Sequence, residues 1–288
     1  MKRFLRYILY FCLLFCSVYG VIIGRYIFKM RSYSFALPQN KTILVIGDSQ
    51  TQAAIDDSLV VNMANVSQAH DNYFTMLLRM KLYLEANQHI DTVVLGVTPH
   101  TTAYFKDDFF TNYGYIDYVT KYYIPFMSFQ DWYVVLRSDM SDVFSSLFTP
   151  IRFYLNVDKS YVNDMGHFEV ADYSHLQEDL AEGATRLTGG DINAKVELHN
   201  QLTLHYLHAI VDYCKENNIK LIGLNTPVYN SRQYMRVDDF YRLMLSEFTD
   251  MELGDYMDAE IPDDYRRDVN HLNRKCANWM SEEINKRT

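Results

Sequence analysis

A short apolar run that ends in Gly-Asp-Ser constrains the fold of this chain more than any other feature. Residues Ile43-Leu44-Val45-Ile46 are all apolar and mostly β-branched, which is typical of a strand that is buried on both faces of a sheet. Gly47 ends the run, and Ser49 stands where a helix is expected to begin. The sequence therefore predicts a parallel α/β sheet with a serine at the carboxyl end of its first strand.

Similar apolar runs recur along the chain and alternate with helical patterns. We expect further strands at 60–66, 92–97, 219–224 and 251–256, and helices at 73–85, 195–216, 237–248 and 272–284. Strands that alternate with helices form an open parallel sheet with helices on both faces, which is a three-layer architecture. Such sheets bind their ligands at the carboxyl ends of the strands.

Residues 104–190 interrupt this alternation. The stretch is crowded with Tyr, Phe, Asp and Ser, and we expect it to form a largely helical cap inserted into an α/β domain that spans residues 41–288. Two interpretations stay open. The cap forms a lid or a substrate platform, or its helices simply pack, because tyrosines stack on sugar rings and also fill cores.

Residues 1–31 have the pattern of a membrane anchor. Tyr7–Ile23 is uncharged and mostly apolar, near the lower length limit for a spanning helix. The basic cluster before it favours a cytoplasmic N-terminus, with the body in the periplasm or at the cell surface. A cleaved signal peptide, with a weak site at Val18-Tyr19-Gly20, is the alternative. Residues 32–40, which include Pro38, are expected to be a linker.

Charge and cysteine usage exclude several classes of function. The net charge is −9, and none of the 36 acidic residues falls in residues 1–31, so the body is strongly acidic and no nucleic-acid partner is expected. No cofactor or metal site is expected, since His205 and His208 have no carboxylate or cysteine at ligand spacing. Cys214 and Cys276 either form one disulfide bridge or, as their helical patterns favour, stay free and buried.

A polar segment near the end of the chain supplies what a nucleophilic serine needs. Free serine is a poor nucleophile and requires an adjacent base. In Asp268-Val269-Asn270-His271 a carboxylate precedes a histidine by three residues, so Asp268 can orient the imidazole of His271 while its other nitrogen reaches Ser49. The alternative is that Ser49 and His271 merely cap helices. Their joint placement at one sheet edge favours the catalytic interpretation.

Two motifs carry a family resemblance. Ile-Gly-Asp-Ser at 46–49, taken with Asp-Val-Asn-His-Leu-Asn at 268–273, resembles the GDSL/SGNH hydrolase superfamily, and more narrowly its membrane-anchored branch of cell-envelope acyl-transfer and esterase-like proteins. The resemblance covers roughly residues 41–103 and 191–288. It implies a flavodoxin-like three-layer sheet with Ser49 as nucleophile, His271 as base and Asp268 as the orienting carboxylate.

The chain departs from the family pattern where oxyanion donors are expected. The usual glycine after the second strand is replaced by Ala69, whose backbone N–H can still donate if the turn accommodates a Cβ. The usual asparagine of the third block is missing from residues 96–100, where Thr98 or His100 is the expected substitute. Asn225, at the end of the fourth strand, falls at the same edge and is expected to contact substrate.

These features predict an extracytoplasmic serine esterase or O-acyltransferase. Its expected substrate is an acyl group, most plainly acetyl, carried by a cell-envelope or exported polysaccharide. The expected partners are the membrane, an acylated glycan or small ester, and other envelope proteins. The alternative is a catalytically weak or inactive module that binds glycan or scaffolds an envelope assembly. The missing asparagine and the replacement by Ala69 favour this second hypothesis.

Overall fold

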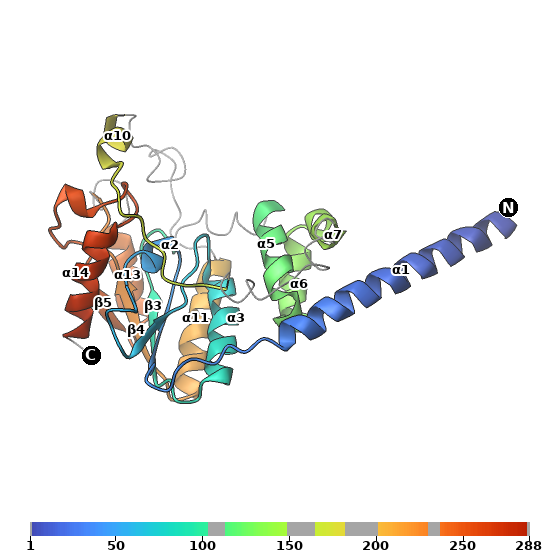
Figure 1. Ribbon diagram of the computed structural model, residues 1–288, viewed down its shortest axis with the longest axis horizontal. Helices are drawn as coiled ribbons and strands as arrows, with labels where there is room; N and C mark the ends of the chain where they lie inside the picture. Colours follow the sequence, from blue (N-terminus) through green and yellow to red (C-terminus); the bar gives the residue numbers. More distant parts are fainter. Residues whose placement is uncertain (1, 103–112, 149–164, 182–200, 230–236, 287–288) are drawn as a thin grey trace. The chain divides into compact units, whose positions relative to one another are not determined.

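The computed structural model describes residues 2–102, 113–148, 165–181, 201–229 and 237–286. The chain forms two compact units (Figure 1). The helical unit contains residues 1–34 and 110–163, and the α/β unit contains residues 35–109 and 164–288.

A five-stranded parallel sheet forms the centre of the α/β unit. Its strands are β1 (Ile43–Ile46), β2 (Met63–Asn65), β3 (Thr92–Gly96), β4 (Lys220–Asn225) and β5 (Glu252–Asp255). The order β2-β1-β3-β4-β5 is that of a flavodoxin-like sheet. In the register, Val45 is paired with Asn65 on one side and with Val94 on the other. The predicted fold class is confirmed.

The helices of this unit follow the predicted alternation. They are α2 (Ser49–Gln52), α3 (Tyr73–Ala86), α10 (Leu176–Ala181), α11 (Gln201–Glu216), α13 (Val237–Glu247) and α14 (Arg274–Asn285), with a 3₁₀ turn, η4 (Asp263–Tyr265). The helix expected from residue 195 is described only from Gln201 onward, so residues 195–200 lie outside the described chain. Every expected strand is found, and no strand end lies more than three residues from its expected position.

Both faces of the sheet are covered, which explains why its strands are continuously apolar. On one face, strand residues pack against the last helix in a cluster that includes Ile43, Val45, Val94, Leu224, Cys276, Met280 and Ile284. The alternate residues Leu44 and Val93 point the other way and are also completely buried. On that side α3 and α11 lie next to each other (Figure 1), where the rings of Phe74 and Tyr206 meet edge to face.

Two glycines let α2 approach the sheet closely. A Cβ on Gly47 would lie 2.3 Å from Oγ1 of Thr51, and a Cβ on Gly96 would lie 2.0 Å from the same atom. Thr51 therefore occupies space that any other residue at either strand end would fill. The close approach keeps the first residue of α2, Ser49, at the carboxyl edge of the sheet.

The helical unit contains a helix that is long and apolar enough to cross a membrane. Its elements are α1 (Lys2–Arg31), α5 (Tyr113–Tyr123), η2 (Ile124–Phe126), α6 (Phe129–Ser138) and α7 (Met140–Phe148). The candidate span covers Arg3–Arg31. The last turns of α1 belong to the unit's core, because the Tyr26 hydroxyl donates to the carbonyl of Lys121 and Arg31 Nε donates to that of Pro125 at 3.0 Å.

The structure divides the expected cap of residues 104–190 between the two units. Residues 113–148 pack with α1, whereas residues 165–181 belong to the α/β unit. The remaining parts of the cap lie outside the described residues, and a lid role stays a prediction. The linker expected at 32–40 also joins the α/β unit from Phe35 onward, because Asn87 Nδ2 donates to the carbonyl of Phe35 at 2.8 Å.

Candidate active site

Ser49 is the first residue of α2 and lies directly after the end of β1. Asp48 caps this short helix: its backbone is extended, and its carboxylate accepts a hydrogen bond from the backbone N–H of Gln50 at 3.0 Å. The Asp48 side chain is almost completely buried. The cap therefore orients the turn that presents the serine.

The tertiary structure brings Ser49, His271 and Asp268 into one hydrogen-bonded chain. His271 Nε2 lies 2.9 Å from Ser49 Oγ, and His271 Nδ1 lies 2.9 Å and 3.0 Å from the two carboxylate oxygens of Asp268. The backbone N–H groups of Asn270 and His271 each donate to Asp268 Oδ1 at 2.8 Å. These bonds fix the carboxylate in its own turn, so that it can hold the imidazole in place.

Asp268 remains ionised at neutral pH despite its partial burial. Burial by itself raises the pKa of a carboxyl group, but the hydrogen bond and charge of His271 and the hydrogen bonds from Arg267 and the Asn270 N–H outweigh it. Together they hold the pKa of Asp268 well below its usual value of 3.8. The carboxylate is therefore available to stabilise an imidazolium.

Arg267 also contacts this site, and the motif gave no signal for it. Its Nε donates to Asp268 Oδ2 at 2.8 Å, and its Nη2 lies 2.9 Å from His271 Nδ1. A guanidinium can only donate, so the second contact requires an unprotonated Nδ1, whereas the contact with Asp268 requires Nδ1–H. Only the Nδ1–H tautomer leaves Nε2 free to accept the proton of Ser49. The two contacts therefore compete for the tautomer of His271.

Ala69 lies in a turn that accommodates its Cβ. The N–H of Asp71 donates to the carbonyl of Gln68 at 3.3 Å, and the residue with positive φ in this turn is His70, at 66°. The strained position thus falls on His70, and Ala69 has an ordinary conformation. Within the described chain the backbone N–H groups of Ser49 and Ala69 donate to no other residue, so both are available to an oxyanion.

A buried ion pair holds both ends of the loop that carries Ala69. Arg79 Nη1 donates to the carbonyl of Val66 at 3.0 Å and lies 2.5 Å from Asp71 Oδ2, and both charged side chains are completely buried. Thr75 Oγ1 donates to the other oxygen of Asp71 at 3.0 Å. The sequence gave no sign of this pair, because an arginine on a helix is usually exposed.

The segment 165–175 connects this loop with the Asp268–His271 turn. The N–H of His167 donates to the carbonyl of Ser67 at 3.0 Å, and the N–H of His175 donates to that of Arg267 at 2.5 Å. Figure 1 shows the segment in yellow, running along the α/β unit from α10. Gly166 is required here because its φ is 103° and a Cβ would lie 2.0 Å from the carbonyl oxygen of Val66.

The other expected donors are placed less favourably. Thr98 Oγ1 accepts from the N–H of Thr101 at 3.2 Å and donates its proton to Oε1 of the buried Gln50 at 3.1 Å, so it has no proton left to donate. Asn225 is completely buried, and its Nδ2 donates to Asp255 at 3.2 Å, which joins the ends of β4 and β5.

His100 lies beside the nucleophile turn. Its Nδ1 is 3.4 Å from Asp48 Oδ2, and 23% of its side chain is exposed. Of the three side chains expected to replace the missing asparagine or contact substrate, it is the one still open to solvent.

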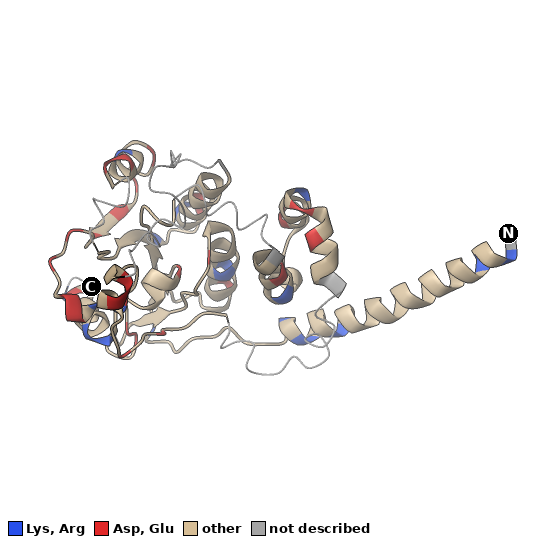
Figure 2. Ribbon diagram, turned by 90° about the horizontal axis from the view of Figure 1, so that it is seen from above, with Lys and Arg blue, Asp and Glu red and all other residues tan. Residues whose placement is uncertain are grey.

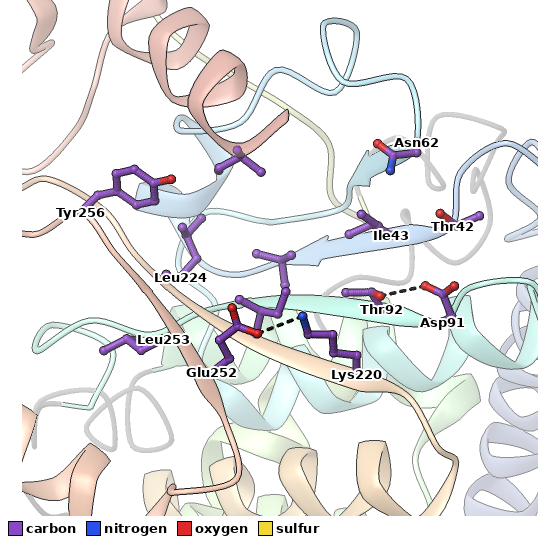
Figure 3. A pocket seen from close by; sticks show the side chains of 14 residues that line it. Thr42, Ile43, Asn62, Asp91, Thr92, Lys220, Leu224, Glu252, Leu253 and Tyr256 are labelled. Carbon is purple, nitrogen blue, oxygen red and sulfur yellow. Dashed lines mark hydrogen bonds and ion pairs between the residues drawn. The ribbon is translucent and has the colours of Figure 1, made fainter. Parts of the chain in front are cut away.

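A cavity of about 350 Å³ runs along one face of the sheet, from the amino-terminal ends of the strands as far as Leu224 (Figure 3). Its lining includes Thr92, Lys220 and Glu252, and an ion pair of 2.9 Å joins the last two. None of its lining residues belongs to the Ser49 site. In the part of the chain that the structure describes, no group of three or more His, Cys, Asp or Glu residues is arranged to hold a metal ion.

The comparisons with known proteins leave the family open. No protein-family model and no curated protein matches the sequence. Among solved structures, the chain is similar to a GDSL-like lipase from Bacteroides thetaiotaomicron, with 9% identity and a TM-score of 0.38 over 92% of this chain and 97% of that one. A likeness at this level does not establish a family, so the chemistry of the site is inferred from its own residues.

Proposed function

We propose that this protein is a serine esterase or O-acyltransferase that works through an acyl-enzyme on Ser49. The observation that carries the proposal is the continuous chain from Ser49 Oγ through both nitrogens of His271 to Asp268, with distances of 2.9 to 3.0 Å. A merely capping serine and a merely capping histidine need no such connection. An activated serine requires it.

The first half-reaction forms the acyl-enzyme. Ser49 Oγ attacks the ester carbonyl while His271 Nε2 takes its proton, and Asp268 stabilises the imidazolium. The backbone N–H groups of Ser49 and Ala69 hold the tetrahedral oxyanion. When this intermediate collapses, the C–O bond of the ester breaks and the leaving alcohol takes the proton from His271, so Ser49 carries the acyl group.

The second half-reaction decides between the two activities. An acceptor hydroxyl attacks the acyl-Ser49 carbonyl, His271 removes its proton, and Ser49 leaves with that proton. Water as acceptor yields a carboxylic acid, whereas a sugar hydroxyl yields a new ester. We propose O-acetyl groups of a cell-envelope or exported polysaccharide as substrate, with the α/β unit outside the cytoplasm. The candidate span in α1 and the basic residues before it support this location.

The test is covalent labelling of the full-length protein in detergent with a fluorophosphonate, read by intact mass. We expect one label on the wild type and none on Ser49→Ala or His271→Ala. Ser246→Ala, a change on α13, serves as the matched control and should label normally. A folded wild type that takes no label would reject the proposal. With labelling established, acetyl transfer from 4-nitrophenyl acetate to oligosaccharides, compared with hydrolysis, identifies the acceptor.

A second candidate is a weakly catalytic module that binds glycan. One observation favours it: Thr98 has its proton engaged by Gln50, so the Thr98 side chain does not donate to an oxyanion. Loss of one such donor commonly costs about 10²–10³ in rate. Two results together would support this candidate: the fluorophosphonate does not label the wild type, and the Ser49→Ala variant binds glycan as tightly as the wild type does.

A further inference from the structure

Four large apolar side chains are exposed on two consecutive helices of the helical unit. On α6 these are Phe129, 96% exposed, and Tyr133, 64% exposed; on α7 they are Met140, 60%, and Phe144, 51%. Because each pair is separated by four residues, its members lie on the same side of their helix. We refer to these four side chains as the α6–α7 face. Each helix therefore presents an exposed apolar pair, and exposed apolar groups that gather on one side of an element are typical of an interaction surface.

The helical unit is fastened to the end of the candidate membrane span. Tyr26 and Met30 of α1 are completely buried, and the hydrogen bonds from Tyr26 and Arg31 end on η2 and the end of α5. Figures 1 and 2 both show α5, α6 and α7 beside the carboxyl-terminal part of α1. This part of α1 also carries basic residues, which are typical of the headgroup region.

Tyr19 lies near the end of the apolar run of α1. Tyr19 is only 9% exposed, yet it lies inside the apolar run Tyr7–Ile23. With a rise of 1.5 Å per residue, it stands about 6 Å inside the end of that run. Its ring stacks on that of Phe15, one turn earlier on the same helix, with the ring centroids 6.0 Å apart. An aromatic pair of α1 therefore lies near the level at which the apolar run ends.

We propose that the α6–α7 face lies in the headgroup region of the same bilayer that α1 crosses, with lipid as its occupant. Aromatic side chains are enriched at that depth, and short helices with one apolar side lie in the plane of the interface. Phe129, Tyr133 and Phe144 fit this role, and Met140 adds a flexible apolar contact. The inference rests on the span and the helical unit and is independent of the chemistry of Ser49.

The two tryptophans of the chain provide the test, because Trp132 lies on α6 and Trp279 on α14 of the other unit. The full chain carrying Trp279→Phe is reconstituted in phosphatidylcholine–phosphatidylglycerol vesicles with brominated acyl chains. We expect Trp132 emission to be lost, most strongly with bromines nearest the headgroups. The reciprocal Trp132→Phe protein, which keeps Trp279, should lose little emission.

Substitution of the face completes the test. Replacing all four side chains by serine in the Trp279→Phe background should reduce the quenching by brominated lipid, with unchanged helical circular dichroism. Leu245→Ser is the matched control, since Leu245 is 76% exposed but lies on α13 of the α/β unit. Trp132 emission that resists brominated lipid would overturn the proposal. If Trp132 is then also shielded from aqueous acrylamide, a protein surface covers the face instead.

Discussion

Arg79 and Asp71 form an ion pair of 2.5 Å in which both side chains are completely buried. Burial of two charges costs more free energy than a packed apolar pair would, so such a pair is poor evidence of stabilisation. Its position is informative instead, because Arg79 also binds the carbonyl of Val66. The pair thereby fixes both ends of the loop that carries the Ala69 N–H.

A double variant can distinguish the effect of this ion pair on stability from its effect on catalysis. Arg79→Met alone leaves Asp71 buried without its partner and should cost about 3–5 kcal/mol of unfolding free energy. Asp71→Leu combined with Arg79→Met removes both charges and should recover most of that loss. The kcat of the double variant should nevertheless remain below that of the wild type, by a factor of up to about 10²–10³, because the oxyanion donor is displaced. Urea unfolding and kcat with 4-nitrophenyl acetate measure the two effects.

Hydrogen exchange of the 66–71 loop provides the control for this experiment. Faster exchange of its amides in the stable double variant would show that the pair positions the loop. A double variant with wild-type kcat and wild-type exchange would show that the pair has no such role.

Asp268→Asn should reduce activity by about 10⁴, because the amide does not enforce the tautomer that leaves His271 Nε2 free. The same change should alter stability with pH. Since the folded-state pKa of Asp268 is lowered, its carboxylate stabilises the fold above the usual value near 4, and this contribution is lost as pH falls through the lowered value. The unfolding free-energy gap between wild type and variant should therefore narrow below about pH 4.

The exposed pair of Asp250 with Lys215 supplies the comparison. Asp250→Asn should change neither activity nor the pH dependence of unfolding, because exposed ion pairs contribute little. A free-energy gap for Asp268→Asn that stays constant down to pH 2 would contradict the role assigned to its ionised form.

Gly96→Ala should destabilise the protein by roughly 1–3 kcal/mol, because the added Cβ meets Thr51 Oγ1 at 2.0 Å in a packed region. Gly254→Ala is the matched change on β5, where the nearest atom lies at 3.5 Å, and it should be nearly neutral. Thr51→Ala, introduced into Gly96→Ala, should recover part of the loss. Denaturant unfolding of the four proteins measures this. Equal stability of the two glycine variants would refute the close packing of α2 on the sheet.

Cys214 and Cys276 should resist alkylation in the folded protein. Both are free and buried, and burial raises the pKa of each thiol to about 12, so the reactive thiolate is scarce at pH 8. Iodoacetamide should modify them only after unfolding. A variant with Cys12→Ser and Cys16→Ser removes the two exposed cysteines of α1. A disulfide-linked peptide containing Cys214 and Cys276 after non-reducing digestion would contradict this result.

Much of the fold could be predicted because its signals are local. The run Ile43–Ile46 is apolar at every position, the interiors of β3 and β4 carry no charged residue, and such strands need cover on both faces. The end of each run predicted a strand end within three residues. The 113–148 helices were expected, but their grouping with α1 was not, because the packing of Tyr26 and Met30 depends on segments about a hundred residues away.

The candidate site was predictable only where a short motif carries its chemistry. Ser49, Asp268 and His271 stand in such motifs, and sheet topology explains why they meet at the carboxyl edge of the strands. Arg267, Arg79 and Gln50 stand in none.

By itself, the sequence determined the parallel sheet, the apolar span and the identity of the serine, aspartate and histidine. These follow from runs and spacings over a few residues, where the side chain's own hydropathy and chemistry decide the outcome. Three features were decided by the tertiary structure alone. The Thr98 hydroxyl donates to Gln50, Asn225 binds Asp255, and the buried Arg79 holds the loop that carries Ala69. Those hydrogen bonds join residues far apart in the chain, and only the closed fold fixes the distances and the burial that make them favourable.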